Sequence, residues 1–266
     1  MKKSLLLFAL VLLLAGCAST GNQAAPAGGT PAGSPSEEPG LTAGAPEKMT
    51  CRIVDGAEEG ELVLAGPGGA GDVYTLDTEG LAVDGPLADG AMVEVGFDGM
   101  ILETYPAKFG HVTGVTVLEE PADDRCGLCL QVLSDLWEVD TALNTGLEEL
   151  GVDLSGLTDL AESEKSALAW VFGNAHGLMP ITGTLEEIWE AGYLTPMTEP
   201  AEGYEDSVAL YRWENGCLFS LSGSAEEGFE AQKWASGLGA YFFTDCTARQ
   251  NADGTWTYEV GVEAIA

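Results

Sequence analysis

Two cysteines separated by two residues form the motif with the clearest capacity for chemistry in this chain. Cys126-Gly127-Leu128-Cys129 has the spacing of thiol–disulfide oxidoreductases, in which a helix N-terminus lowers the pKa of one thiol. Here Asp123 and Asp124 precede the pair, and acidic neighbours raise a thiol pKa instead. A zinc site would need two further ligands, and neither histidine stands at a recognised spacing. We therefore expect a surface thiol pair or a local disulfide, with redox or metal chemistry as the alternative.

A further cysteine, Cys17, follows a short apolar segment at the amino end. Met1-Lys2-Lys3 is positively charged, and residues 4–13 form an apolar run of about ten residues, shorter than the roughly 20 that a membrane-spanning helix needs. Leu14-Ala15-Gly16-Cys17 then places two small residues directly before a cysteine. We expect residues 1–16 to be a signal peptide that is removed.

Residues 1–17 resemble the lipobox segment of bacterial lipoproteins, in which this cysteine carries a thioether-linked diacylglycerol. The resemblance implies that Cys17 is the lipidation site and that the lipid bilayer is a partner, with the protein anchored on the extracytoplasmic face of the cell membrane. Residues 18–48 are rich in Gly, Ala, Pro, Ser and Thr, with almost nothing large and apolar. We expect residues 17–48 to be the lipidated cysteine and a disordered linker, with a reach of roughly 30 Å.

With Cys17 acylated, five cysteines remain, and an odd number cannot pair fully within one chain. Cys217 and Cys246 lie on neighbouring predicted hairpins. A disulfide across the sheet and two buried free thiols are equal alternatives for them. The sequence indicates no cofactor.

The charge balance excludes one class of partner. The chain has 10 Lys and Arg against 43 Asp and Glu, a formal net charge of −33. Nucleic-acid binding needs a basic face that neutralises phosphates, so we exclude nucleic acid. An anionic membrane surface would repel the folded part, which leaves the lipid as the means of attachment. The candidate partners are a cation, a basic protein or a cell-envelope glycan, and the sequence leaves the oligomeric state open.

Residues 49–120 show short alternating apolar runs interrupted by Gly and Asp, the pattern of antiparallel strands. Asp98-Gly99 predicts a two-residue hairpin between residues 91–97 and 100–105. In that register Glu94 lies opposite Glu103. The pair is a candidate for a cation site, and the alternative is two solvated carboxylates turned apart.

The run from Val93-Glu94-Val95 through Phe97-Asp98-Gly99 to Glu103-Thr104-Tyr105-Pro106-Ala107 is similar to a small OB-like domain of uncharacterised lipoproteins from Gram-positive bacteria. The resemblance covers residues 49–120 and implies a small antiparallel OB-like β-barrel with no known activity. OB folds elsewhere bind single-stranded nucleic acid through basic grooves. The 14 acidic and 2 basic residues of this region predict that this one does not.

Residues 121–127 are interpreted as a hinge before a second domain at residues 128–266, which contains all six tryptophans. Helices are predicted over residues 128–139, 159–176 and 184–192, the second ending at Gly177 and the third opening on a capping box at Thr184. Asn215-Gly216 and residues 251–254 predict hairpins. The expected fold class is α+β: a small antiparallel OB-like β-barrel followed by an α+β domain with helices packed on an antiparallel sheet.

The second domain also shows a resemblance. The strings Asp135-Leu136-Trp137 and Leu143-Asn144, with the run from Lys233 to Cys246, resemble a C-terminal domain of uncharacterised secreted clostridial-type proteins. The resemblance covers roughly residues 128–266. It implies the domain boundary and a location outside the cytoplasm, and it supplies no mechanism.

Aromatic residues on predicted strands are the candidate ligand-binding residues. Trp213 and Trp256, together with Tyr211 or Tyr258, would suit a platform for sugar rings, and the alternative is that these residues belong to the core. Acidic pairs are too abundant to identify a glycosidase, and the sequence offers no Ser-His-Asp arrangement near a nucleophile motif. No catalytic residue is assigned.

We therefore expect a membrane-tethered extracytoplasmic lipoprotein that serves as a binding or accessory module instead of an enzyme. The alternative is a cell-envelope enzyme that hydrolyses glycan or peptide with acidic residues of the C-terminal domain. A concave pocket that holds a carboxylate of raised pKa beside Trp or Tyr would favour the enzyme. A flat acidic surface would favour binding.

Overall fold

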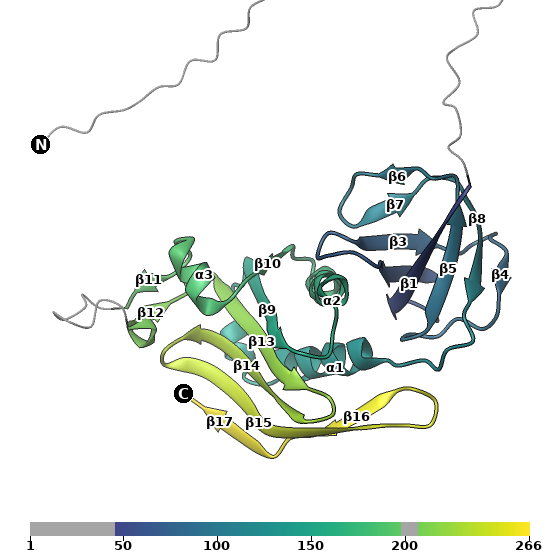
Figure 1. Ribbon diagram of the computed structural model, residues 1–266. Helices are drawn as coiled ribbons and strands as arrows, with labels where there is room; N and C mark the ends of the chain where they lie inside the picture. Colours follow the sequence, from purple (N-terminus) through teal and green to yellow (C-terminus); the bar gives the residue numbers. More distant parts are fainter. Residues whose placement is uncertain (1–45, 198–206) are drawn as a thin grey trace, which may run out of the picture. The chain divides into compact units, whose positions relative to one another are not determined.

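The computed structural model describes residues 46–197 and 207–266, which belong to one compact unit. The chain is mostly β with few helices and forms two sheets, one of them curled into a half-barrel (Figure 1). The predicted signal peptide, Cys17 and most of the predicted linker lie outside the described residues. Within those residues, no helix has the length and apolar character needed to cross a membrane.

The first sheet comes from the amino-terminal half of the described chain and contains β1 (Glu47–Asp55), β2 (Glu61–Ala65), β3 (Val73–Asp77), β4 (Val83–Asp84), β5 (Met92–Phe97), β6 (Ile101–Leu102), β7 (Ala107–Phe109) and β8 (Val112–Val117). The second sheet contains β9 (Glu149–Leu157), β10 (Pro180–Thr182), β11 (Thr195–Pro196), β12 (Tyr211–Arg212), β13 (Gly216–Ser224), β14 (Gly228–Ser236), β15 (Gly239–Gln250), β16 (Trp256–Glu259) and β17 (Val262–Ile265). The helices are α1 (Arg125–Glu138), α2 (Glu162–Ala175) and α3 (Leu185–Glu190), with the 3-10 turns η1 (Thr141–Asn144) and η2 (Val208–Leu210).

The first sheet has the strand order β4-β8-β5-β1-β2-β3-β7-β6. Strand β5 shows the alternation that favours this sheet: Val93, Val95 and Phe97 are buried on its core face, and the residues between them are partly exposed. The pairs β3–β7 and β4–β8 are parallel, so the prediction of a purely antiparallel sheet is wrong. Parallel neighbours need long connections, and several intervening strands provide them here.

The hairpin predicted at Asp98-Gly99 does not form. Gly99 has a positive φ of 78°, as a turn requires, but β5 pairs with β1 and β8 and not with residues 100–105. Of that segment only Ile101–Leu102 is strand, and it pairs with β7. The chain therefore leaves β5 at this turn, because β1 and β8 already occupy both edges of the strand.

The predicted opposition of Glu94 and Glu103 fails for the same reason. Glu94 lies opposite Thr50 on β1 and Thr116 on β8. Its carboxylate forms an ion pair with Lys48 at 2.5 Å. Glu94 therefore has a cationic partner of its own, and the two residues do not make a cation site together.

Helix α1 begins at Arg125, three residues earlier than predicted, inside the predicted hinge. Asp124 is its N-cap, and the carboxylate accepts a hydrogen bond from an amide of the first turn at 2.9 Å. The residues before the helix are held on both sides, because Asp123 donates its backbone N–H to Gly90 and Asp124 donates to Gly254. The segment is a fixed junction in this structure.

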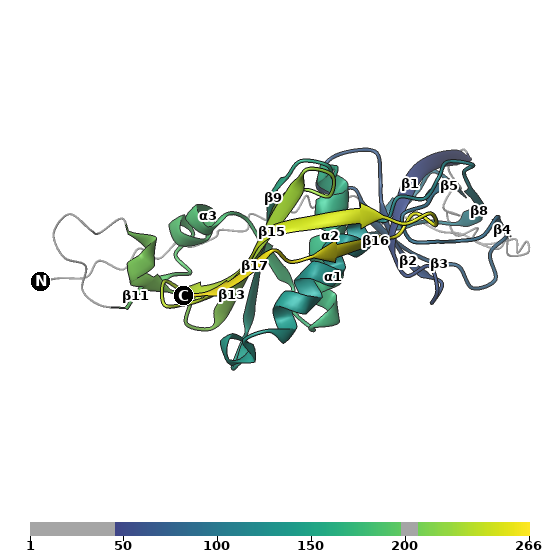
Figure 2. The same ribbon diagram turned by 90° about the horizontal axis from the view of Figure 1, so that it is seen from below.

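The second sheet has the strand order β10-β9-β13-β14-β12-β11, and β15 also pairs with β14. Strands β16 and β17 both lie beside β15 (Figure 2). Strand β9 pairs in parallel with β10 and with β13. Helix α2 joins β9 to β10 and supplies the crossover that parallel neighbours need. The prediction of an antiparallel sheet is therefore wrong at this edge.

Of the predicted turns and short helix in the second half, two are confirmed and one is wrong. The hairpin at residues 251–254 is confirmed by the pairing of β15 with β16. Helix α3 is confirmed with its capping box, in which Thr184 Oγ1 accepts from Glu187 N at 3.2 Å. The turn at Asn215-Gly216 does not join a hairpin, because β12 and β13 do not pair with each other and both pair with β14.

Helix α2 packs against strands of both sheets and links their cores. The core cluster that contains α1 and α2 also takes in four residues of the first sheet, namely Val54, Val63, Ala65 and Val73. At the start of α2, Ser163 Oγ donates to Gly66 O at 2.8 Å, and Glu164 forms an ion pair with Arg52 of β1 at 2.5 Å. The two sheets are therefore held together by apolar packing and by polar contacts of one helix.

Lys233 on β14 is fully buried and caps the carboxyl end of α1. Its Nζ donates to the carbonyls of Trp137 at 3.3 Å, Val139 at 2.9 Å and Asp140 at 3.3 Å. Nζ also lies 5.6 Å from the centre of the Phe219 ring. Burial lowers the pKa of Lys233. A positive charge at this end of a helix is favourable, because the free carbonyls point toward it.

Replacing Lys233 with Met keeps a long apolar side chain and removes the three hydrogen bonds. We expect Lys233→Met to lower the free energy of unfolding by about 1–3 kcal/mol, because the carbonyls at the end of α1 lose their donor. Urea unfolding measures the change. Arg249→Met, at an exposed position on β15, is the control and should stay within about 0.5 kcal/mol of the parent. Equal losses in both variants would contradict this role of Lys233.

Candidate functional site

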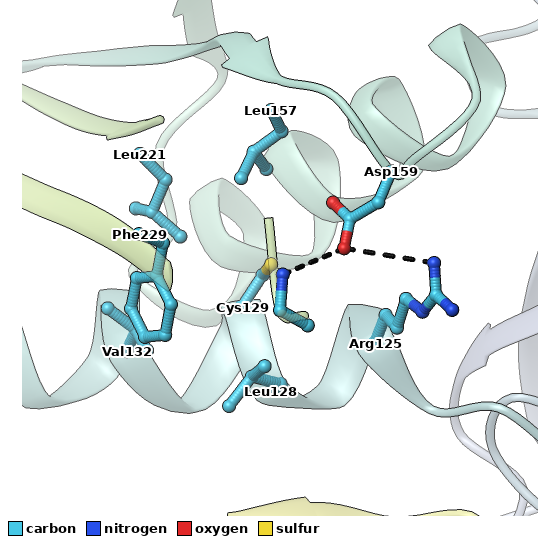
Figure 3. A pocket seen from close by; sticks show the side chains of 9 residues that line it. Arg125, Leu128, Cys129, Val132, Leu157, Asp159, Leu221 and Phe229 are labelled. Atoms are coloured by element: carbon cyan, nitrogen blue, oxygen red, sulfur yellow. Dashed lines mark hydrogen bonds and ion pairs between the residues drawn. The ribbon is translucent and has the colours of Figure 1, made fainter. Parts of the chain in front are cut away.

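A small cavity lies beside the start of α1, at the predicted thiol motif (Figure 3). Its volume is about 10 Å³, which is room for one water-sized sphere. Most of its lining is apolar, with Leu128, Val132 and Phe229 around it and Cys129 on its wall. This cavity is too small to hold a ligand.

The described residues contain five cysteines, all free and buried. The predicted surface thiol pair is wrong, because Cys126 and Cys129 are 1% and 7% exposed and no disulfide joins them. Burial raises the pKa of Cys129 to about 12 and raises that of Cys126 well above its ordinary value. Both side chains fall on the buried face of α1, since the helix begins before the motif and they stand three residues apart.

For Cys217 and Cys246, the alternative of two buried free thiols is confirmed. They are 0% and 1% exposed. Burial raises the pKa of Cys217 to about 12 and that of Cys246 to about 11. No described cysteine offers a thiolate at neutral pH, so these residues give no support to redox chemistry.

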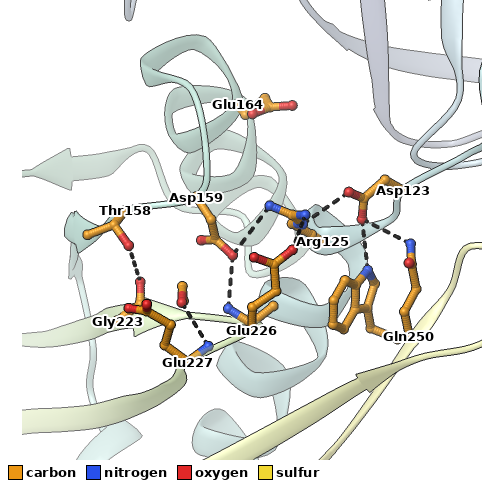
Figure 4. Close-up of polar contacts among 12 residues, drawn as sticks. Asp123, Arg125, Thr158, Asp159, Glu164, Gly223, Glu226, Glu227 and Gln250 are labelled. Carbon is orange, nitrogen blue, oxygen red and sulfur yellow. Dashed lines mark hydrogen bonds and ion pairs between the residues drawn. The ribbon is translucent and has the colours of Figure 1, made fainter.

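Arg125 stands at the centre of an acidic junction (Figure 4). Its guanidinium lies 3.0 Å from Asp123, 3.8 Å from Asp159 and 2.8 Å from Glu226. It also lies 5.7 Å from the centre of the Trp256 ring. These contacts tie the first turn of α1 to the loops at the ends of β9 and β13 and to β16. The guanidinium is already surrounded by carboxylates, so we interpret the junction as structural.

Acidic groups also gather where the loop before β5 meets the start of α1. Desolvation raises the pKa of Asp124 to about 6, and the charges of Asp89, Asp55 and Asp123 add to this, against the amide of Gly127 that lowers it. Burial raises the pKa of Asp55 and of Asp89 as well. Within the described ranges no three or more His, Cys, Asp or Glu are arranged to hold a metal ion. Burial and mutual repulsion therefore disfavour the ionised form of these carboxyl groups, and the described residues are not arranged to hold a metal ion.

Because the pKa of Asp124 is raised on folding, its ionisation opposes folding. The contribution to stability is complete below the ordinary Asp pKa of about 4 and is lost as the pH rises through about 6. We expect Asp124→Asn, which can still cap α1, to melt at a higher temperature than the parent at pH 8 and at the same temperature below pH 4.

Melting curves from pH 3.5 to 8 test this expectation. Asp84→Asn, at an exposed position on β4, is the control and should follow the parent at every pH. A parent and an Asp124→Asn variant with the same melting temperature at pH 8 would contradict the assignment.

The predicted aromatic platform does not exist as one site. Trp213 is 3% exposed, and its Nε1 donates to Glu149. Tyr211 packs beside it in the same core cluster, with its ring 5.1 Å from that of Trp189. Trp213 therefore has no free face for a sugar ring.

Trp256 and Tyr258 pack against a different core cluster. Trp256 Nε1 donates to Asp123 at 2.8 Å, and the Tyr258 hydroxyl donates to Asp135 at 2.5 Å. Burial and that hydrogen bond raise the pKa of Tyr258. Both side chains are partly buried, and their polar ends are hydrogen-bonded to carboxylates of the same chain, as in aromatic residues at the margin of a core.

A groove of about 980 Å³ lies between the first sheet and α2. Its lining comes from the end of β1, from β2 and β3, from residues 104–112, and from Trp170 and Asn174 of α2. Tyr105 is 48% exposed, and its hydroxyl donates to Ser166 O of α2 at 3.4 Å. The volume is at the upper end of the range for ligand pockets, so this groove is the candidate binding site.

The groove is strongly acidic. Asp55, Glu59, Glu61 and Asp77 line it, against Lys108 as the one Lys or Arg in its lining. The seven ion pairs among the described residues use other carboxylates. Four acidic side chains therefore face the groove without an ion pair.

The sequence did not single out this groove, although it named parts of its wall. Tyr105 entered only through the resemblance to an OB-like domain. The groove combines the first sheet with α2, which follows in the chain after α1 and β9. One local signal was available: the Gly-rich turn at residues 66–71 joins β2 to β3 and sets Glu61 opposite Asp77.

In comparisons with known proteins, no family model, no curated protein and no solved structure matches this chain. The site is therefore interpreted from its own geometry and charge.

Proposed function

We propose that the protein is a lipoprotein tethered through Cys17 to the extracytoplasmic face of the cell membrane, and that it is a binding or accessory module whose ligand occupies the groove between the first sheet and α2. The order of residues 1–17 supports the tether. The groove carries the proposed binding function, because it combines a large concave volume with exposed polar and aromatic side chains.

We further propose that the first sheet is an OB-like module. The curled strands β1, β2, β3 and β5 support this assignment. In OB folds the face of the second and third strands and the loop between the first two bind ligands. The groove is lined by β2, β3 and the β1–β2 turn, which agrees with that use of the fold.

One observation favours a cell-envelope hydrolase as a second candidate. Asp55 lines the groove together with Tyr105 and Trp170, and burial and the nearby charges of Asp89 and Glu59 raise its pKa. A carboxyl group of raised pKa in a groove is a candidate general acid. Hydrolysis of cell-wall glycan by the parent and not by Asp55→Asn would support the enzyme over the binding module.

The tether predicts a loss of attachment on removal of one thiol. We expect Cys17→Ala to move the protein from the membrane fraction to the soluble fraction, because two acyl chains anchor a protein firmly and the folded part is too acidic to bind an anionic membrane alone. Fractionation with immunoblotting measures this. Cys51→Ala is the control, since Cys51 is buried in the first sheet. Retention of Cys17→Ala in the membrane fraction would remove the proposal of lipid anchoring.

The groove predicts a ligand whose binding depends on Tyr105. We expect a thermal-shift screen of cell-wall oligosaccharides, basic peptides and divalent cations to contain at least one compound that raises the melting temperature of the parent and not of Tyr105→Ala. Tyr241→Ala, on β15 and outside the groove, is the matched control and should keep the shift. A screen in which every shift survives Tyr105→Ala would contradict a ligand site in the groove.

A further inference from the structure

The acidic side chains of the groove are concentrated on its sheet wall. Asp55 ends β1, Glu59 lies in the turn that follows, and Glu61 begins β2. Glu61 stands directly opposite Asp77 in the antiparallel pairing of β2 with β3. Two carboxylates in this position repel each other and destabilise the pair. The fold therefore holds like charges together at this wall.

Lys108 is the one Lys or Arg that lines the groove, where it faces four carboxylates, so the wall keeps a net negative charge. The ion pairs of the described residues employ five basic side chains at other places, which are Lys48, Arg52, Arg125, Lys165 and Arg212. Lys233 is buried against the end of α1. A cationic ligand would offset the repulsion between Glu61 and Asp77 and would gain from four carboxylates at once.

The shape and the aromatic side chains narrow the class of cation. A bare metal ion is not favoured, because no described group of three or more acidic, His or Cys side chains is arranged to hold one. Tyr105 is 48% exposed, and Trp170 lines the helix side of the same groove. Guanidinium and ammonium groups bind aromatic faces, and guanidinium also pairs with carboxylates in a planar fork. A volume of about 980 Å³ holds several such side chains.

We infer that the groove binds a basic segment of polypeptide in extended form, with Arg or Lys side chains directed to Asp55, Glu59, Glu61 and Asp77 and stacked on Tyr105 or Trp170. The inference rests on the proposed function of the groove as the ligand site and names the class of partner. The carboxylates supply the charge selectivity. The aromatic side chains prefer arginine to lysine.

The test is calorimetric titration of the full-length protein in non-ionic detergent with hexa-arginine. Hexa-citrulline, which has nearly the same shape without the charge, and an uncharged chitin hexasaccharide are titrated in parallel. Because the whole protein is acidic, two variants of equal charge are compared: Glu59→Gln with Glu61→Gln inside the groove, and Glu119→Gln with Glu120→Gln at exposed positions outside it. All four substitutions are at exposed positions, and thermal unfolding checks that both variants fold.

We expect hexa-arginine to bind with one-to-one stoichiometry and hexa-citrulline to show no binding. The groove variant should bind about tenfold more weakly, and the outside variant should stay within about twofold of the parent. Binding that weakens equally in both variants would mean diffuse attraction to an acidic protein and would overturn the inference. Absence of hexa-arginine binding would overturn it as well.

The outcome for the sugar separates this inference from the proposed function. Saturable binding of the hexasaccharide that is lost in Tyr105→Ala and unchanged in the groove variant would overturn a basic partner and leave the groove as a ligand site. Hexa-arginine binding that is unaffected by Tyr105→Ala and weakened equally by the two double variants would count against the basic partner and against the groove as a ligand site.

Discussion

The structure depends on the burial of helix α2 against both sheets. Its apolar face joins the core of the second sheet to residues of β1, β2 and β3. Its first turn is fixed to the first sheet by Ser163 and Glu164. Because this end is fixed, the following turns of α2 bring Trp170 and Asn174 to the first sheet, and the groove exists only as a result of that placement.

The acidic side chains differ in whether a basic side chain neutralises them. Some basic side chains are engaged where elements meet, as Arg52 is at α2 and Arg125 at the start of α1. Lys108 alone among the Lys and Arg residues lines the groove. The pairing of β2 with β3 sets Glu61 and Asp77 opposite each other there. Carboxylates without an ion pair give this wall a negative potential.

Burial also decides the chemistry of side chains that look reactive in the sequence. Cys126 and Cys129 have the spacing of a redox pair, and desolvation inside the α1 core removes the thiolate on which that chemistry depends. Trp213 has the type of a sugar-binding residue and is enclosed in the core. In each case the motif is local, whereas the dielectric environment and the exposure come from distant parts of the chain.

The sequence by itself determined local features of this protein: the β character of residues 49–120, the end of α2 shortly before Gly177, the start of α3 after its N-cap Thr184, and the turn at residues 251–254. Backbone preferences and periodicity act over a few residues, so these features could be predicted. Tertiary structure alone decided which strands are neighbours. Asp98-Gly99 and Asn215-Gly216 both have hairpin composition, yet the adjoining strands found other partners, and the parallel pair of β9 with β10 required α2 between them. The groove is likewise a tertiary product, because its two walls meet only when hydrophobic burial folds α2 onto the first sheet.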